Sequence, residues 1–279
     1  MRRIAIQGEP GCYHDIAAHA FFPDEPLELV CMETFEQLFG CMREDPSLVA
    51  LVAIENTIAG SLLHNYELLR ESGLQIVGEQ KVRISHSLLC LPDDGWEDLR
   101  EVNSHPVALA QCRDWLQQHG DLKVVEADDT AGAAKWISCH RLHGHAAICS
   151  KSAAPLYGMK VLAEGIETNK HNFTRFLVVC DPQHFAEGVN QPNKASIVFS
   201  LPHSAGSLSA VLSIFSFYTI NLTKIQSLPI IGREWEYMFY ADVTYDDLTR
   251  YRQSIDAIRP LTSGLQILGE YAEGRAYIP

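Results

Sequence analysis

Two segments near the N-terminus share a strand–turn–helix order that restricts the fold classes open to this chain. Residues 4–6 are apolar and lead through a turn rich in glycine and proline into an alanine-rich segment of helical character. Residues 49–54 form a second apolar run, and the polar segment 55–61 and another predicted helix follow it. Strands that alternate with helices in this way predict an α/β architecture with parallel strand pairing.

Both junctions are suited to binding an anion. A glycine turn before a helix lets a ligand approach free backbone N–H groups, and the helix dipole favours negative charge at the same place. Cys12 lies in the first junction, and Ser61 ends the second, where it is a candidate N-cap. Since such junctions are common in α/β proteins, neither alone identifies a site.

A third segment places a hydroxyl beside a guanidinium at the start of a predicted buried strand. Thr174 and Arg175 precede the apolar run 177–179. A hydroxyl proton donor next to a fixed cation suits an anionic substrate that must lose an oxygen atom. From this segment alone, a strand start with a solvated arginine is an equally good interpretation. Together with the two junctions, the segment predicts a site that clasps a small dianion.

The composition narrows the classes of partner. The formal net charge of −13 argues against nucleic acid, whose phosphates require basic faces. No apolar run approaches the ~20 residues of a membrane span, and the N-terminal segment lacks the apolar stretch of a signal peptide. The eight cysteines include no Cys-x-x-Cys pair, which predicts reduced thiols in a cytoplasmic protein.

One cluster of histidine and cysteine is dense enough to suggest a metal site, namely Cys139, His140, His143 and His145. It falls at the end of a predicted helix, where cationic histidines are favourable, and no carboxylate lies beside it in the sequence. We therefore predict that this cluster binds no metal.

Four motifs together resemble those of one enzyme family, the monofunctional prephenate dehydratases. Residues 174–176 match the family's Thr-Arg-Phe signature, and residues 54–61 match its Ile-Glu-Asn segment that ends in Gly-Ser. Residues 104–112 match its Ser-His-Pro…Gln-Cys segment, and residues 156–163 match its Leu-Tyr-Gly element. The resemblance implies conversion of prephenate to phenylpyruvate in phenylalanine biosynthesis, with no cofactor.

The resemblance also implies roles for single residues. Thr174 would be the catalytic residue, acting as a general acid on the departing hydroxyl. Substrate contacts are expected from Cys12, Asn56, Ser61, Gln111, Arg175 and Phe176. The chain departs from the family at Cys12 and His14, where hydroxyl side chains are usual. Because a thiol is a poorer hydrogen-bond donor than a hydroxyl, this departure bears on substrate contact by Cys12.

The implied organisation is a catalytic domain over residues 1–181 and an ACT regulatory domain over residues 194–279. The catalytic domain would be two-lobed and periplasmic-binding-protein-like, with crossings between the lobes near residues 74–91 and 162–174. The polar segment 182–193 contains two prolines and is predicted to be a linker.

The C-terminal segment has the β-α-β-β-α-β order of a ferredoxin-like unit. Its predicted strands are 194–201, 220–227, 235–245 and 264–271, and its predicted helices are 206–218 and 247–258. It resembles an ACT domain, an amino-acid-sensing module that usually pairs with a copy of itself. This implies feedback by L-phenylalanine in a homodimer or homotetramer. The expected effector contacts are Gly206, Ser207, Leu208, Asn221, Leu222 and Ser227.

Two alternatives to a prephenate dehydratase remain open. Arogenate dehydratase acts on a substrate with an ammonium group where prephenate has a keto oxygen, and one or two pocket residues could decide between them. A catalytically silent amino-acid sensor is the alternative from another class, and the complete motif at Thr174 argues against it. The chain begins at the first dehydratase strand, so we expect no fused chorismate mutase domain.

Overall fold

The computed structural model describes residues 1–184, 191–230, 232 and 236–279. Residues 185–190 of the predicted linker and Trp235 of the strand predicted over 235–245 lie outside the described residues. The chain divides into two compact units. The first unit comprises Met1–Leu62, Gln80–Phe176 and Ala276–Pro279, and the second comprises Leu63–Glu79 and Leu177–Arg275.

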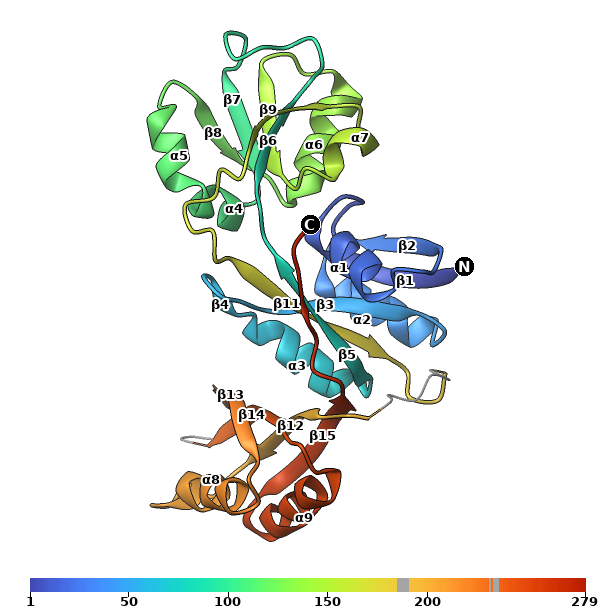
Figure 1. Ribbon diagram of the computed structural model, residues 1–279, viewed down its shortest axis with the longest axis vertical. Coiled ribbons are helices and arrows are strands. Elements are labelled where there is room, and N and C mark those ends of the chain that lie inside the picture. The colour runs from blue at the N-terminus through green and yellow to red at the C-terminus, as the bar shows by residue number, and fades with distance from the viewer. Residues whose placement is uncertain (185–190, 231, 233–235) are drawn as a thin grey trace. The chain divides into compact units, whose positions relative to one another are not determined.

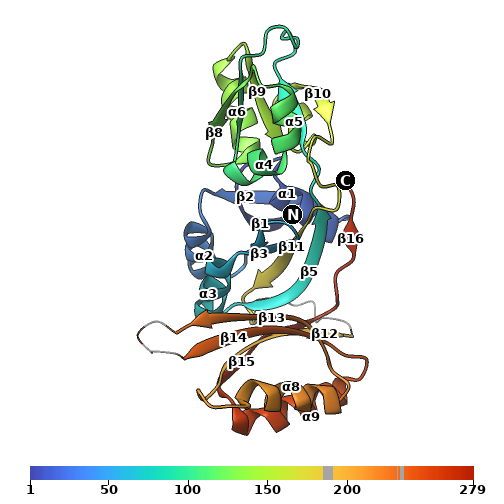
Figure 2. The ribbon, with the colours of Figure 1, turned by 90° about the vertical axis from the view of Figure 1, so that its left-hand side faces the viewer.

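The first unit contains two lobes, each built on its own sheet (Figure 1). The sheet of the first lobe has the strand order β16-β5-β11-β3-β1-β2, with β4 beside β3. Its strands are β1 (Arg2–Gln7), β2 (Leu27–Met32), β3 (Val49–Asn56), β4 (Gly60–Ser61), β5 (Gln75–Arg83), β11 (Phe173–Cys180) and β16 (Ala276–Tyr277). Strand β1 pairs in parallel with β2 and β3, and β16 runs parallel to β5 (Figure 2).

The helices of this lobe are α1 (Tyr13–Phe21) and α2 (Phe35–Glu44). Helix α2 begins where Thr34 Oγ1 accepts the backbone N–H of Gln37 at 3.2 Å. The Gln37 side chain in turn accepts the N–H of Glu33 at 3.0 Å, so local sequence satisfies the helix start from both sides. Strand β3 is buried along nearly its whole length, as its apolar sequence predicts.

The second lobe holds a five-stranded sheet of order β10-β6-β9-β7-β8. Its strands are β6 (Ser87–Cys90), β7 (Glu101–Ser104), β8 (Lys123–Glu126), β9 (His145–Cys149) and β10 (Lys160–Glu164). Its helices are α4 (Pro106–Gln111), α5 (Arg113–Gln118), α6 (Thr130–His140) and α7 (Ala153–Leu156). The chain enters this lobe between β5 and β6 and leaves it between β10 and β11.

The second unit carries a four-stranded antiparallel sheet of order β13-β14-β12-β15. Its elements run β12 (Lys194–Ser200), α8 (Ser207–Phe217), β13 (Asn221–Pro229), β14 (Tyr237–Thr244), α9 (Leu248–Ile258), η1 (Arg259–Leu261) and β15 (Ser263–Tyr271). Helices α8 and α9 cover one face of this sheet around Phe199, Phe215 and Tyr251 (Figure 2). The two-lobed α/β class and the β-α-β-β-α-β order are therefore confirmed.

Helix α3 (Leu63–Ser72) and the first residues of β5 cluster with this C-terminal segment in the second unit. The ring of Tyr66 on α3 lies 5.2 Å from that of Tyr240. The ammonium of Lys194 lies 3.0 Å from both carboxylate oxygens of Glu79, and both side chains are almost fully buried. The predicted domain boundaries 1–181, 182–193 and 194–279 do not follow this division of the chain.

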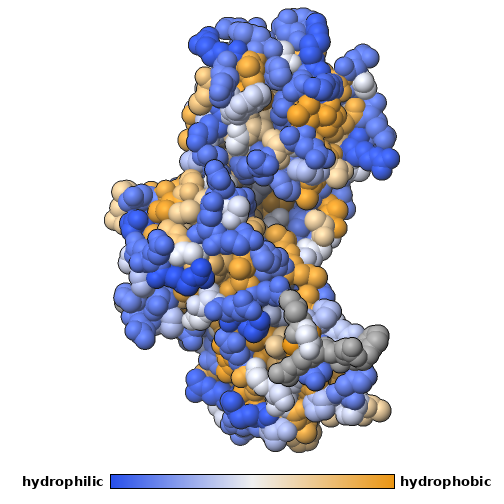
Figure 3. Space-filling view, turned by 180° about the vertical axis from the view of Figure 1, so that it is seen from behind, coloured by the Kyte–Doolittle hydropathy of each residue, from blue (hydrophilic) through white to orange (hydrophobic). Residues whose placement is uncertain are grey.

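Hydrophilic residues cover most of the face shown in Figure 3, and hydrophobic residues gather there in patches. This distribution fits a chain with 35 acidic and 22 basic residues. Within the described residues, none of the helices is long and apolar enough to span a membrane.

Candidate active site

A cavity of about 230 Å³ in the first unit is lined by residues from both lobes. Five of the seven predicted site residues line it, namely Cys12, Asn56, Gln111, Thr174 and Phe176. The other two, Ser61 and Arg175, are not among the described residues that form its wall. The structure therefore brings together residues that are up to 164 positions apart in the chain, because the strand ends of both lobes meet at this place.

Three helix N-termini reach the wall of this cavity. Cys12 and Tyr13 begin α1, His105 and Val107 begin α4, and Asp129 begins α6. The first turn of a helix carries partial positive charge and favours a carboxylate. None of the described residues in this wall is lysine or arginine. The helix termini are therefore the positive ends available to an anion here, and the α6 terminus is already capped by the Asp129 carboxylate.

The amide of Asn56 is held in one orientation by the backbone. Its Oδ1 atom accepts the N–H groups of Ile58 at 2.9 Å and Ala59 at 2.8 Å. Its nitrogen must therefore face the other way, where it donates to Asn172 Oδ1 at 2.8 Å and to Thr174 Oγ1 at 3.0 Å. The turn after β3 thus fixes which atom of Asn56 is a donor.

The orientation of Asn56 determines what the Thr174 hydroxyl can do. The Thr174 oxygen accepts a hydrogen bond from the Asn56 amide, so its own proton is directed elsewhere. Since Thr174 lines the cavity, a bound molecule can accept a hydrogen bond from the Thr174 hydroxyl. The arrangement makes Thr174 a hydrogen-bond donor toward the cavity.

Gln111 is held by the same chain of amides, a series of hydrogen-bonded side-chain amides that runs from Asn56 through Asn172 to Gln111. The Asn172 nitrogen donates to Gln111 Oε1 at 2.9 Å, and the Gln111 nitrogen donates to Asn56 Oδ1 at 3.5 Å while the residue lines the cavity. Asn172 is fully buried and has its two amide atoms engaged by Asn56 and Gln111. The sequence prediction gave Asn172 no role. Its position two residues before Thr174 could have indicated that it lies close to the site.

An apolar wall completes the cavity. Phe176 is 1% exposed, and its ring meets the ring of His14 edge-on at a centroid distance of 4.9 Å. His14 Nε2 accepts the backbone N–H of Ala53 at 3.3 Å, so this ring nitrogen carries no proton. Burial lowers the pKa of His14 to about 3. His14 is therefore a neutral, partly apolar group where the family usually has a serine.

The family model for prephenate dehydratase matches residues 4–184, which is more than half of the chain. The chain belongs to the prephenate dehydratase family.

Relatives and solved structures agree with this membership. Arogenate dehydratase 1 of Petunia hybrida is 38% identical, over 96% of this chain and 66% of the relative. Arogenate dehydratase/prephenate dehydratase 2 of Arabidopsis thaliana, a chloroplastic protein, is 37% identical over 96% of this chain and 72% of the relative. The chain thus spans about two thirds of the length of these relatives.

Two solved structures share the fold over nearly the full chain. Prephenate dehydratase from Arthrobacter aurescens in complex with L-Phe has a TM-score of 0.85 and 25% identity, over 97% of this chain and 90% of that chain. GqqA, described as a novel type of quorum-quenching acylase, has a TM-score of 0.86 and 29% identity, with 98% of each chain covered.

Arg175 lies apart from the cavity of this dehydratase. Successive side chains of a strand point to opposite faces, and Thr174 and Phe176 on either side of it both line the cavity. The Arg175 guanidinium is 3.9 Å from Glu55 Oε2, and the residue is 8% exposed. The side-by-side placement of hydroxyl and guanidinium toward one anion, expected from the sequence, is therefore not the arrangement found.

We expect Arg175→Lys to change the KM for prephenate by less than about threefold, because the guanidinium is absent from the cavity wall. The same substitution should lower the free energy of unfolding by about 1 kcal/mol, since the lysine keeps the charge near Glu55 but not the fork geometry. Steady-state kinetics and urea denaturation measure the two effects. A tenfold rise in KM with unchanged stability would restore the substrate-binding role predicted from the sequence.

Ser61 lies two residues before the following helix, α3. It ends strand β4 and pairs with Glu55 across an antiparallel turn, and α3 begins at Leu63. The glycine turn is used to fold the chain back on β3. Its backbone N–H groups at Ile58 and Ala59 then hold Asn56 rather than a ligand.

Cys12 is a neutral thiol in this site. Burial and the nearby Asp129 carboxylate raise the pKa of Cys12 well above its usual value. Its Sγ atom lies 3.7 Å from the Gln7 carbonyl oxygen, a weak contact. The backbone at the start of α1, rather than this side chain, is the stronger partner for a carboxylate.

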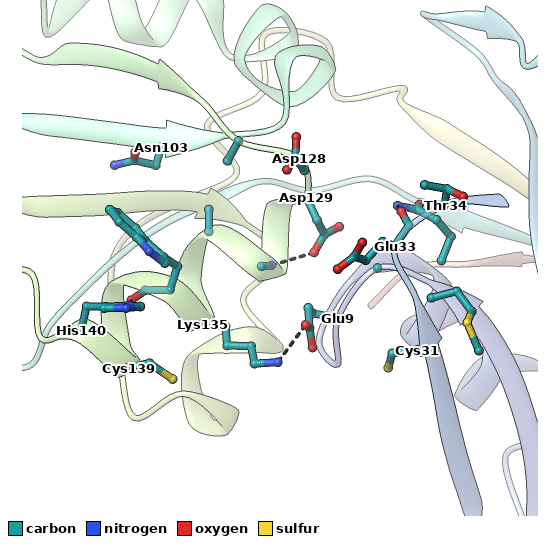
Figure 4. Close-up of a pocket in the computed structure, with 17 residues that line it drawn as sticks. Glu9, Cys31, Glu33, Thr34, Asn103, Asp128, Asp129, Lys135, Cys139 and His140 are labelled. Atoms are coloured by element: carbon teal, nitrogen blue, oxygen red, sulfur yellow. Dashed lines mark hydrogen bonds and ion pairs between the residues drawn. The ribbon is translucent and has the colours of Figure 1, made fainter. Parts of the chain in front are cut away.

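A larger cavity of about 1060 Å³ adjoins the first and shares Gln7, Asp128 and Asp129 with it. Figure 4 shows Glu9, Glu33 and the two aspartates facing this space. Lys135 donates to Glu9 at 2.8 Å across it, and Asp129 accepts the N–H of Gly132 at 2.6 Å. To the Asp128 and Asp129 that the two cavities share, the larger cavity adds two carboxylates, Glu9 and Glu33, and one cation, Lys135, so it is the less favourable of the two for a dianion.

The histidine-rich segment has partners that the sequence did not reveal. His143 Nδ1 lies 2.6 Å from Asp94 Oδ1, and His145 Nδ1 lies 3.3 Å from Glu101 Oε1. Carboxylates thus lie beside two of the histidines in space. In the described part of the chain, no three His, Cys, Asp or Glu residues are grouped as a metal site would require.

The acid sensitivity of the fold is expected to depend on His14. Its pKa is about 3 in the folded protein and about 6.5 in an unfolded chain, so below pH 6.5 the unfolded chain takes up a proton that the folded protein does not. The free energy of unfolding should therefore fall by up to about 1.4 kcal/mol per pH unit between pH 6.5 and 3. Urea denaturation of wild type and His14→Gln at several pH values tests this, and equal slopes would contradict it.

The predicted effector residues lie in the second unit. Gly206 has a φ of 85° and precedes α8, and Ser207 and Leu208 line a cavity of about 130 Å³. Ser227 pairs with Phe239, whose side chain lines the same cavity. Asn221 and Leu222 pair with Thr244 and Val243 at the opposite end of β13. One chain therefore places its glycine loop and Asn221 at different ends of the sheet.

Proposed function

We propose that this protein catalyses the decarboxylating dehydration of prephenate to phenylpyruvate. The observation that carries the proposal is the direction of the hydrogen bond at Thr174. Its oxygen accepts from Asn56, and its proton is offered to a cavity lined by helix N-termini. A dianion that must lose a hydroxyl group needs this combination of anion binding and proton donation.

The reaction is driven by aromatisation. Prephenate carries two carboxylates and a ring hydroxyl, and loss of carbon dioxide together with hydroxide produces an aromatic ring. Thr174 would hydrogen-bond to the departing oxygen and assist proton delivery. A threonine hydroxyl is a weak acid, so positioning and a preorganised polar environment must supply a large part of the rate enhancement. The apolar wall at Phe176 favours decarboxylation, because negative charge is dispersed as the carboxylate is lost.

Substrate contacts are assigned to the residues that line the cavity. The start of α1 at Cys12 would bind one carboxylate through backbone N–H groups. Gln111 would donate to the substrate from the amide nitrogen that also contacts Asn56 Oδ1 at 3.5 Å, and Asn56 would act through Thr174. Ser61 and Arg175 would support the site through β4 and Glu55.

Arogenate is a second candidate substrate. The carboxylates of Asp128 and Asp129 lie in the cavity wall, where they would repel an anion and attract the ammonium that distinguishes arogenate. Several relatives are named as arogenate dehydratases. Purified protein should be given prephenate and arogenate in parallel, with phenylpyruvate and phenylalanine measured as products. Turnover of neither substrate would overturn the proposed function.

The acylase described among the similar structures does not change this proposal. Acyl transfer to a thiol needs a thiolate, and the pKa of Cys12 is raised by burial. Among the described residues, the hydrogen-bond partner of the Cys12 sulfur is a backbone carbonyl rather than a side-chain base. Cys12→Ser should therefore keep dehydratase activity within about threefold of wild type.

We also infer regulation by L-phenylalanine through the C-terminal ACT domain, with residues 1–181 as the catalytic domain and 182–193 as the linker. The effector would contact Gly206, Ser207, Leu208 and Ser227 of one chain and Asn221 and Leu222 of a second chain. This division of contacts requires a homodimer, or a homotetramer built from dimers. A cytoplasmic location is supported by eight free cysteines, which suit a reducing compartment.

L-phenylalanine is expected to bind and inhibit even though Gln226 and Leu228 replace the acidic and basic residues usual in the family. Backbone groups at the glycine loop can match the ammonium and carboxylate of an amino acid without those side chains. Loss of a partly exposed ion pair costs about 0–1 kcal/mol, too little to abolish a site. Calorimetry with millimolar L-phenylalanine, with D-phenylalanine as the control, tests this. Absence of heat and of inhibition would mean a lost sensor.

A further inference from the structure

His86 lines the active-site cavity, and the proposed mechanism gives it no role. It is 2% exposed and sits in the segment between β5 and β6 that leads into the second lobe. Its backbone N–H donates to Glu167 at 2.9 Å, and its carbonyl accepts the N–H of Ile166 at 3.0 Å. The two segments that join the lobes therefore hold the His86 backbone on both sides.

The ring of His86 touches two cavity residues through its two nitrogens. Nε2 lies 2.9 Å from Gln111 Oε1, and Nδ1 lies 3.1 Å from the Tyr13 hydroxyl oxygen. The Tyr13 hydroxyl is also 2.8 Å from the carbonyl oxygen of Ser85. Which nitrogen of His86 carries the proton follows from the polarity of these partners.

The partner at Nε2 can only accept. The backbone N–H groups of Ile58 and Ala59 set the orientation of the Asn56 amide. The Asn56 nitrogen donates to Asn172 Oδ1, which sets the orientation of the Asn172 amide. The Asn172 nitrogen therefore faces Gln111 Oε1. If the Gln111 amide were reversed, its nitrogen would meet the nitrogen of Asn172, and two donors would face each other. Gln111 therefore presents an oxygen to His86, and His86 Nε2 must carry the proton.

We propose that His86 is a positioning residue that donates from Nε2 to Gln111 and thereby holds the direction of the amide chain that ends at Thr174. This inference rests on the proposed function. The chain of amides has two anchors, the backbone after β3 at one end and His86 at the other. With both in place, the Gln111 nitrogen donates to Asn56 Oδ1 at 3.5 Å and the Thr174 proton faces the cavity.

The surroundings of the ring support this assignment. Burial lowers the pKa of His86, and burial raises the pKa of Tyr13 well above its usual range, so both groups are neutral at pH 7. A neutral ring with a proton on Nε2 leaves Nδ1 as an acceptor, and the single proton of the Tyr13 hydroxyl is then shared between Nδ1 at 3.1 Å and the Ser85 carbonyl oxygen at 2.8 Å. The Tyr13 ring also meets the His86 ring edge-on at 5.6 Å, which fixes the ring plane.

Two substitutions separate the nitrogens of His86. In His86→Gln the amide nitrogen can reach the place of Nε2, whereas in His86→Asn the shorter amide occupies the place of Nδ1. We expect His86→Asn to lower kcat/KM about ten- to a hundredfold, because a misplaced Gln111 and Thr174 weaken catalysis. His86→Gln should stay within about fivefold of wild type. Equal activities of the two variants, whether both high or both low, would overturn the proposal.

A spectroscopic measurement tests the tautomer without reference to activity. In ¹⁵N-histidine-labelled wild type, the resonance that disappears in His86→Gln should show a protonated Nε2. A bare Nε2 on that ring would overturn the proposal even if both variants retain activity. If the protein turned over neither prephenate nor arogenate, the proposed function would fail, and the tautomer would still report whether the amide chain has the inferred direction.

Discussion

Thr174→Ala is expected to lower kcat for prephenate by about 10²–10⁴, the range typical of a lost general acid. The Thr174 oxygen already accepts from Asn56, so the proton removed in this variant is the one offered to the cavity. Substrate affinity should change little, because the carboxylate-binding helix termini are untouched. Thr174→Ser should keep much of the activity, since the hydroxyl survives. Rapid-quench or steady-state assays of both variants measure the effect, and a wild-type rate in Thr174→Ala would exclude the catalytic role.

Asn56→Asp is expected to impair catalysis about as strongly as loss of the Thr174 hydroxyl. An aspartate oxygen can still accept the N–H groups of Ile58 and Ala59, so the turn after β3 should keep its conformation. The other carboxylate oxygen cannot donate to Thr174, and the Thr174 proton would turn toward it instead of toward the substrate. The substitution reverses the hydrogen bond to Thr174 and also removes the donations to Asn172 Oδ1 and to the Phe173 carbonyl oxygen.

A matched control for this prediction lies in the same unit. Asn169→Asp makes the same chemical change in an exposed turn, where the side-chain oxygen accepts the N–H of His171 at 2.9 Å. We expect the control to keep kcat within about twofold, because Asn169 does not line the cavity. Similar activity in the Asn56→Asp and wild-type enzymes would show that hydrogen-bond direction at Thr174 does not matter.

The fold could be predicted from the sequence because its signals are local. The apolar run of β3 and the capping residues at Thr34 and Gln37 each act over a few residues, and the structure contains both elements. The element order of the C-terminal segment likewise follows from short alternating patterns. Local propensity and global fold agree in these segments, which is the condition under which sequence reasoning works.

The site was predictable in part. Motif resemblance identified Thr174, Asn56 and Gln111, but the direction of each hydrogen bond depends on contacts between residues far apart in the chain. Asn56 and Asn172, for example, are 116 positions apart, and neither His86 nor Tyr13 carries a local signal of its contact with the other. The direction of the hydrogen bonds between these side chains is therefore set only when the whole network is assembled in the folded protein.

The placement of Arg175 could have been predicted more closely. Side chains on a strand alternate between faces, so a strand that begins before Thr174 must direct Thr174 and Arg175 to opposite sides. The structure has β11 beginning at Phe173, which makes both residues part of the regular strand. The prediction that both residues serve the substrate therefore requires the two side chains to act from opposite faces of β11.

The buried pair of Glu79 and Lys194 bears on how such a protein can evolve. Glu79 belongs to the N-terminal part of the chain and Lys194 is the first residue of β12, yet both are buried in the same compact unit. A substitution that removes the Lys194 ammonium while the rest of the unit stays folded would leave the Glu79 carboxylate buried without this partner, which costs about 3–5 kcal/mol. A change at either of these two positions is therefore expected to require a matched change at the other. Residues 79 and 194, which lie on separate segments of the chain, would then evolve together.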